Sequence, residues 1–282
     1  MRLAGTSLPD QKTGEDAALE IHLPHPVFDS HFHGLHIEER GMDADRLLAA
    51  LFSSGLTGAV DVAVDENNFE RRLQWAAIHS RLRLSAGIHP SSSAENSALS
   101  WDERLEIISN QAKHPKVAAI GESGLDFYRE HAPREIQMRA FRDQLDLAAA
   151  LNKPVIIHNR DADEQLLSLI RDSSCRMGVL HCFSSDWETA RQALDLGYYI
   201  SFAGNITYKK TENLQDAAKR IPEDRILIET DSPYLLPQPV RSRKSNHPGY
   251  IGFTLEALAA IRGKEPEHLA RQTNENAMRL FS

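Results

Sequence analysis

The sequence has 282 residues, which fits one large domain or two small ones, and 41% of them are hydrophobic, enough to bury a core without disulfide bridges. Its 40 acidic and 32 basic side chains give a formal charge of −8, which argues against broad non-specific binding of nucleic acid. The sequence lacks a membrane-length apolar run and a signal-peptide core, and it has only two cysteines, so we expect a cytoplasmic protein without a membrane partner.

Residues 1–26 are polar and mixed, and we expect them to form a loose leader that packs little before a single domain over residues 27–282. From Val27 onward, short β-rich runs alternate with stretches in which apolar residues recur every three or four positions, the spacing of a helix face. The predicted strands are Val27–His33, Thr57–Val64, Leu84–His89, Val117–Glu122, Pro154–His158, Gly178–Cys182, Tyr198–Phe202 and Ile226–Asp231. The predicted helices include Asp45–Phe52, Phe69–Ile78, Glu103–Ile108, Ile136–Leu151, Gln165–Ile170 and Thr189–Leu194. Eight such units in about 250 residues favour an α/β fold of the single (β/α)8 TIM-barrel type over an open doubly wound sheet.

Polar and ionisable residues stand at the C-terminal ends of most predicted strands, where a TIM barrel holds its active site. The first strand ends in His31-Phe32-His33, and both histidines share one face because side chains alternate along a strand. Later strand ends carry His89, Glu122, His158, His181, Glu229 and Asp231. One polar strand end is ordinary in a buried sheet, but six on separate strands favour a common site.

Imidazole and carboxylate groups together suit Zn, Mn, Fe or Ni better than Ca. This set is large enough to hold two ions with Glu122 as a bridge, and such pairs of ions activate water for hydrolysis. Asp231 is placed as a ligand or a general base, whereas Glu229 either orients a ligand or belongs to an ion pair, and we favour the first role. Cys182 follows His181 and should point away from the site as a packing residue.

Several sequence runs in order resemble the TatD family of metal-dependent deoxyribonucleases, which are amidohydrolase-like barrels. These runs are DSHFH, GIHP, GESGLDFY, PVIIHNR, HCFS, GYYISFAGNIT, IPEDRILIETDSPYL and NENAMRLF, and they span Val27 to Phe281. The resemblance implies a divalent-metal hydrolase (Mg, Mn or Zn) that cleaves phosphodiester bonds of DNA. It implies as metal ligands His31, His33, Glu122, His158, His181 and Asp231. Asp231 would also activate water with Glu229 supporting the site, and His89 and Arg160 would lie on the substrate side.

The sequence departs from the family pattern at four places. Gly34 stands where Leu is usual, Ser185 where Gly is usual, and Asn246-His247-Pro248 where Asn-Glu-Pro is usual. The leader is also longer than the family commonly has. The third change falls in a region expected to shape the substrate side.

Three functional hypotheses remain at this point. The first is a monomeric exonuclease on single-stranded DNA ends, the second a small-molecule amidohydrolase of the lactonase or phosphotriesterase type, and the third a non-catalytic metal-binding scaffold. The basic run Arg241–Lys244 could contact DNA or be solvated, and Phe127 and Tyr128 could stack on a base or pack under a loop.

Overall fold

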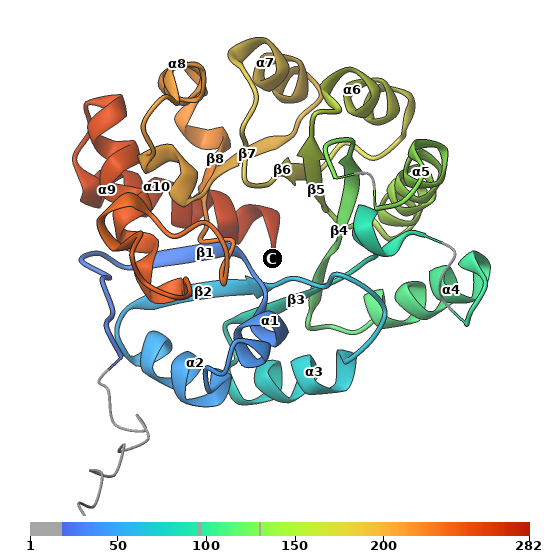
Figure 1. Cartoon of the computed structure of the whole chain (residues 1–282), viewed down its shortest axis with the longest axis horizontal. Coiled ribbons are helices and arrows are strands. Elements are labelled where there is room, and N and C mark those ends of the chain that lie inside the picture. The colour runs from blue at the N-terminus through green and yellow to red at the C-terminus, as the bar shows by residue number, and fades with distance from the viewer. Residues whose placement is uncertain (1–18, 95–97, 130) are drawn as a thin grey trace, which may run out of the picture.

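The computed structural model describes residues 19–94, 98–129 and 131–282 of the chain. Eight strands follow one another around a single sheet, and each is parallel to its neighbours. They are β1 (Val27–Phe32), β2 (Leu56–Asp61), β3 (Leu82–Ala86), β4 (Val117–Asp126), β5 (Val155–Arg160), β6 (Gly178–Leu180), β7 (Tyr199–Phe202) and β8 (Ile226–Ile228). Helices surround this sheet (Figure 1), so the predicted TIM barrel is confirmed.

The barrel closes between β1 and the segment that follows β8. Phe32 pairs in parallel with Ser232, and the Asp231 N–H donates to the His31 carbonyl at 2.9 Å. The buried Asp29 carboxylate strengthens this seam, because it accepts hydrogen bonds from the Thr230 hydroxyl at 2.6 Å and from the Thr230 N–H at 3.1 Å. The open-sheet alternative is therefore wrong.

The helices alternate with the strands along the chain, and two of them follow β8. They are α1 (Gly34–Glu39), α2 (Ala44–Ser53), α3 (Phe69–Ile78), α4 (Trp101–Ala112), α5 (Arg134–Leu151), α6 (Asp163–Asp172), α7 (Trp187–Asp195), α8 (Glu212–Arg220), α9 (Ile251–Arg262) and α10 (Pro266–Leu280). Each of the six helices named from the sequence coincides with one of these elements, and the observed helices begin earlier than most of the predicted ones. No helix in the described part of the chain is both long and apolar enough to span a bilayer.

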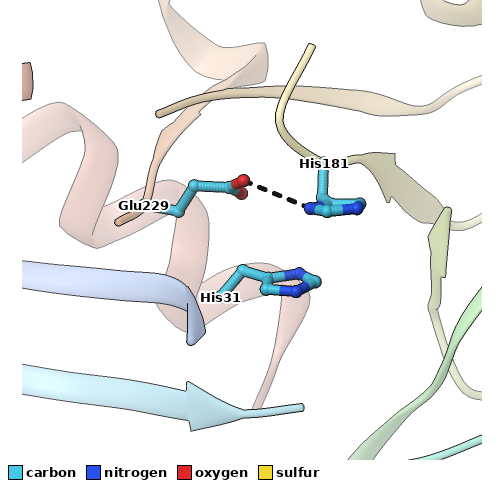
Figure 2. A group of neighbouring side chains, drawn as sticks. All are labelled: His31, His181 and Glu229. Atoms are coloured by element: carbon cyan, nitrogen blue, oxygen red, sulfur yellow. Dashed lines mark hydrogen bonds and ion pairs between the residues drawn. The ribbon is translucent and has the colours of Figure 1, made fainter. Parts of the chain in front are cut away.

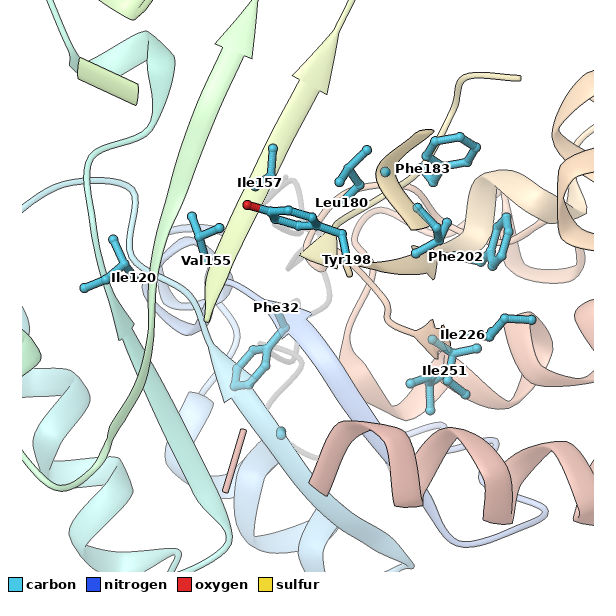
Figure 3. Packing of buried hydrophobic residues seen from close by; sticks show 14 of the residues in the cluster. Phe32, Ile120, Val155, Ile157, Leu180, Phe183, Tyr198, Phe202, Ile226 and Ile251 are labelled. Atoms are coloured by element: carbon cyan, nitrogen blue, oxygen red, sulfur yellow. The ribbon is translucent and has the colours of Figure 1, made fainter. Parts of the chain in front are cut away.

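The core has two layers because strand side chains alternate between the two faces of the sheet. The larger cluster joins one face to the helices, and Figure 3 draws part of it, including Val155 and Ile157 of β5 and Ile251 of α9. The smaller cluster includes Phe28, whose ring stacks on Phe281 at 6.1 Å between centroids. Figure 1 shows the C-terminus near the centre of the barrel, so the end of α10 fills one mouth and leaves the other for a site.

The segment 19–26 packs against the barrel, so the expectation of a loose leader is wrong there, and residues 1–18 lie outside the described part. Leu19, Ile21 and Leu23 alternate along an extended chain and pack against the main core. The His22 ring stacks on Phe253 at 4.1 Å between centroids, and the His22 backbone N–H donates to the Gly249 carbonyl at 2.7 Å. The alternation of apolar residues was the signal for this contact.

Candidate metal centre

The polar residues expected at the strand ends gather at the open mouth of the barrel. His31, Glu122 and His158 lie in β1, β4 and β5, whereas His33, His89, His181 and Asp231 come just after β1, β3, β6 and β8. The predicted ends of β3, β6 and β8 are two or three residues too late, so the last three of these side chains stand on loops.

Glu122 stands between two groups of histidines, and each of its carboxylate oxygens faces one group. Its Oε2 is 3.5 Å from Nε2 of both His31 and His33. Asp231 Oδ1 faces the same two nitrogens at 3.8 Å and 3.6 Å. We call His31, His33 and Asp231 the Oε2 group.

The other oxygen of Glu122 faces a second set of imidazoles. Glu122 Oε1 is 2.7 Å from His181 Nε2, 2.8 Å from His158 Nδ1 and 3.6 Å from His89 Nε2. We call His158, His181 and His89 the Oε1 group. Ring nitrogens and carboxylate oxygens converging at these distances form a donor set that fits a divalent metal.

An irregularity in β4 aims Glu122 into this space. The pairing register between β4 and β5 shifts between Ile120 and Ser123. Gly121 has φ +140°, and a Cβ there would lie 2.7 Å from the Ile156 carbonyl oxygen, so only glycine fits. The Glu122 N–H leaves the β4–β5 pairing and donates to the Ala63 carbonyl at 3.0 Å.

His33 and His181 are each held by a contact of the second ring nitrogen. His33 Nδ1 is 3.0 Å from the Val62 carbonyl oxygen, so this nitrogen carries the proton and Nε2 is free to bind a cation. His181 Nδ1 is 3.3 Å from Glu229 Oε1, a contact drawn in Figure 2 with His31 beside it. Glu229 is fully buried and also accepts the Cys182 N–H at 2.7 Å, which places it as a positioning group behind His181.

Asp126 is a residue of the site that the sequence analysis missed. Its Oδ2 is 3.4 Å from His158 Nε2, so His158 turns its other nitrogen, Nδ1, toward Glu122. Asp126 lies four residues after Glu122 in the same strand, and strand periodicity was the signal that could have found it.

Burial disfavours charge on Glu122 and His181, but the neighbours of these two groups outweigh it. The charge of His181 and hydrogen bonds from His158 and His181 hold the pKa of Glu122 well below its usual range. Burial would lower the pKa of His181, but Glu122 and Glu229 raise it well above the ordinary value. Glu122 is therefore ionised and stabilises a proton on His181, and a cation would replace that proton.

His89 differs from the other histidines of its group. Its Nδ1 accepts the Ser91 N–H at 3.0 Å, so this nitrogen is unprotonated and the hydrogen of the neutral ring is on Nε2, which faces Glu122. Burial lowers the pKa of His89 to about 3, so the ring is neutral near pH 7. His89 can therefore donate a hydrogen bond from Nε2.

Arg160 lies at the end of β5, with its guanidinium 4.1 Å from the centroid of the Tyr128 ring. Tyr128 is exposed, whereas Phe127 is buried, with the Arg134 guanidinium 4.6 Å from its ring centroid. Of the two aromatic residues considered from the sequence, Phe127 therefore packs and only Tyr128 is open to a ligand.

The basic run after β8 is partly engaged by other side chains. Arg241 lies 3.8 Å from the centroid of the Tyr208 ring, and Arg243 pairs with Glu20 at 2.5 Å. Glu20 belongs to the segment before β1, so that segment neutralises part of the run. This arrangement weakens the interpretation of Arg241–Lys244 as a free cationic patch.

Local contacts explain two of the departures from the family pattern, at Gly34 and at residues 246–248. A Cβ at Gly34 would lie 2.6 Å from the Trp75 ring, so a larger residue does not fit this packing. Asn246 Nδ2 donates to the Thr230 carbonyl at 3.0 Å and so supports the loop that carries Asp231. The buried His247 ring stacks on Tyr250 at 4.0 Å between centroids.

Cys182 follows β6 in a left-handed conformation with φ +44°, so strand alternation does not set its direction. Burial and the charges of Asp231 and Glu229 raise the pKa of its thiol well above the usual value, which keeps the thiol protonated. Among the described residues, the groups that could hold a metal do not include Cys182.

Comparison with known proteins shows one family over nearly the whole chain. The model of the TatD-related DNases matches residues 28–282. The chain is 37% identical over 260 residues to the uncharacterized metal-dependent hydrolase YcfH of Escherichia coli, covering 90% of this chain and 95% of that protein. It is 35% identical over 245 residues to the 3'-5' ssDNA/RNA exonuclease TatD of Salmonella typhimurium, covering 85% and 93%.

A solved structure agrees with these sequence relatives. The crystal structure of YjjV, a TatD homologue from E. coli, superposes with a TM-score of 0.82 at 27% identity, covering 91% of this chain and 98% of that one.

Proposed function

The chain belongs to the family of TatD-related DNases, which are metal-dependent hydrolases, and from this premise we propose that it hydrolyses phosphodiester bonds of single-stranded DNA from an end. The Salmonella relative is named a 3'-5' exonuclease, and we propose the same direction for this chain. The residues proposed to bind two divalent cations are His31, His33, Glu122, His158, His181 and Asp231.

One observation carries this proposal: the two oxygens of Glu122 face two separate sets of side chains. Oε2 faces His31 and His33 at 3.5 Å. Oε1 faces His158 and His181 at 2.8 Å and 2.7 Å. A carboxylate shared in this way suits two cations held a few ångströms apart, the arrangement that stabilises both attacking and leaving oxygens of a phosphodiester. When bound, the ions supply positive charge to the phosphoryl oxygens and acidify water.

The side chains around this centre have separate proposed tasks. Asp231 is only 14% exposed, and hydrogen bonding from His33 and the nearby His31 lower its pKa against the effect of burial, so its carboxylate is ionised and can accept a proton from water. His89 donates from Nε2 to a phosphoryl oxygen, and Arg160 pairs with a neighbouring phosphate. Glu229 orients His181 without touching the substrate.

The test begins with protein stripped of metal and then restored with Mg²⁺, Mn²⁺ or Zn²⁺ in turn. Single-stranded DNA labelled at the 5' end, and separately at the 3' end, is followed on a gel, with Asp231→Asn prepared in parallel as the control for a contaminating nuclease. We expect metal-dependent shortening that starts at the 3' end and is lost in Asp231→Asn.

Other outcomes would contradict the proposal. Cleavage that persists in Asp231→Asn would show a contaminant. Protein that holds its ions but leaves DNA intact, while hydrolysing a lactone or a phosphotriester, would assign the site to small molecules instead.

A further inference from the structure

Two exposed tyrosines stand on opposite sides of the metal centre. Tyr128 follows β4 and Tyr234 follows β8, and these two strands lie across the barrel from each other in the order β1 to β8. Tyr128 is 63% exposed and Tyr234 is 39% exposed. A large aromatic ring that is exposed to water at a binding site can contact a ligand through its apolar face.

Both tyrosines contact residues of the metal centre. The Tyr128 N–H donates to Asp126 Oδ1 at 3.1 Å, and the same carboxylate holds His158. The Tyr234 ring lies 6.0 Å from the His33 ring between centroids, in an edge-to-face contact. The two tyrosines therefore flank the cluster, one beside each group of histidines.

An arginine lies over each ring and brings positive charge to an acidic chain. The Arg160 guanidinium is 4.1 Å from the Tyr128 ring centroid, and the Arg40 guanidinium is 4.9 Å from that of Tyr234. Arg40 also donates to the Pro233 carbonyl at 3.0 Å, which fixes it against the same loop. Each pair thus presents an aromatic surface next to a cation, the combination that binds single-stranded nucleic acid by stacking on bases and pairing with phosphates.

We propose that Tyr128 and Tyr234 are stacking platforms for the nucleobases on either side of the bond that is cleaved, with Arg160 and Arg40 holding the adjacent phosphates. This inference rests on the proposed function and names the part of the substrate that the mouth of the barrel recognises. Bases paired and stacked in a duplex cannot reach both rings, so the site takes unpaired nucleotides. Every base has a π face, so recognition is tolerant of sequence.

The experiment measures binding separately from cleavage. Metal-loaded protein carrying Asp231→Asn is titrated into a fluorescein-labelled oligothymidylate of about ten nucleotides, or into the same strand with abasic sites at the end, and anisotropy gives Kd. We expect the strand with bases to bind about 10-fold more tightly than the abasic strand. Tyr128→Ala and Tyr234→Ala should each remove part of this advantage, while Tyr128→Phe and Tyr234→Phe keep it.

A matched control is available at the other end of the barrel. Arg225 precedes β8 and lies over the Tyr199 ring at 5.2 Å from its centroid, so Arg225→Ala removes an arginine–tyrosine contact remote from the mouth. This variant should leave both Kd values unchanged. Equal binding of the two strands, or an equal loss for both strands in the alanine variants, would overturn the stacking role.

The cleavage assay on unsubstituted protein then distinguishes the two proposals. Binding that depends on the bases, without metal-dependent cleavage, would contradict the nuclease function and still support the stacking role of the tyrosines. Cleavage at equal efficiency on strands with and without terminal bases would contradict the stacking role of the tyrosines and still support the nuclease function.

Discussion

The two sides of Glu122 differ in what lies behind their histidines. At Oε1, the second ring nitrogens of His158 and His181 face carboxylates, Asp126 at 3.4 Å and Glu229 at 3.3 Å. A carboxylate behind an imidazole fixes its tautomer and makes the facing nitrogen a stronger ligand. This side is built to hold a cation firmly.

The Oε2 side has weaker support behind its histidines. His33 Nδ1 contacts a neutral group, the Val62 carbonyl oxygen, at 3.0 Å. The carboxylate on this side belongs to Asp231, and its Oδ1 lies 3.6 Å from the other ring nitrogen, His33 Nε2. A carboxylate in front of the histidines can take a proton from water as well as bind a cation. The difference indicates a division of labour, with retention of metal at Oε1 and proton transfer at Oε2.

The largest effect is expected from removing the residue that the two sides share. Glu122→Ala takes away the oxygen that faces each group, so we expect both cations to be lost and activity to fall to that of metal-stripped protein. Metal content after equilibrium dialysis, measured by mass spectrometry, checks this, with circular dichroism as the control for folding. A variant that retains both ions would contradict the bridging position.

A smaller and one-sided effect is expected from Asp231→Asn. The amide keeps the shape of the side chain but accepts a proton poorly, so kcat should fall by about 10²- to 10⁴-fold. The cation on the Oε1 side should remain, since His158 and His181 are unchanged. Loss of both ions in this variant would break the proposed division of labour.

The regular parts of the site could be predicted from the sequence. The pairing of β1 with β2 shifts between Asp29 and Phe32, but His31 and His33 still lie with their Nε2 atoms 3.1 Å apart, as the alternation rule predicts. The barrel follows from the rhythm of apolar runs, because the number of β–α units and the chain length leave few other folds.

The irregular parts could not be predicted in this way. β8 ends at Ile228, and Asp231 has φ +52°, so a loop and not strand alternation sets the direction of its side chain. Glu122 depends on the register shift at Gly121, which no periodicity reveals. The support of His33 by the Val62 carbonyl is a backbone contact and has no side-chain signature.

A test of the Oε1 side alone is Glu229→Gln. The amide can still contact His181 but carries no charge, so the imidazole loses basicity and we expect metal affinity to fall by about 10- to 100-fold. The matched variant Asp126→Asn should weaken the same side through His158. Competition with a chromogenic chelator gives the affinities, and an effect on the weaker-bound cation only would reverse the assignment of the two sides.

Acid weakens metal binding and also lowers the stability of the fold. A substitution at His247 distinguishes these two effects. Burial lowers the pKa of His247 from 6.5 to about 4, so below pH 6.5 the unfolded chain takes up a proton that the folded chain does not. Stability should therefore fall as the pH drops from 6.5 toward about 4, by about 2 kcal/mol at about pH 5. Urea unfolding of metal-free protein at about pH 7.5 and about pH 5 measures this, and His247→Gln, which cannot titrate, should lose that part of the pH dependence. If His247→Gln loses as much stability in acid as unsubstituted protein does, the acid sensitivity lies in the histidines around Glu122. The Oε1 and Oε2 sides of Glu122 must then be compared above pH 6.5.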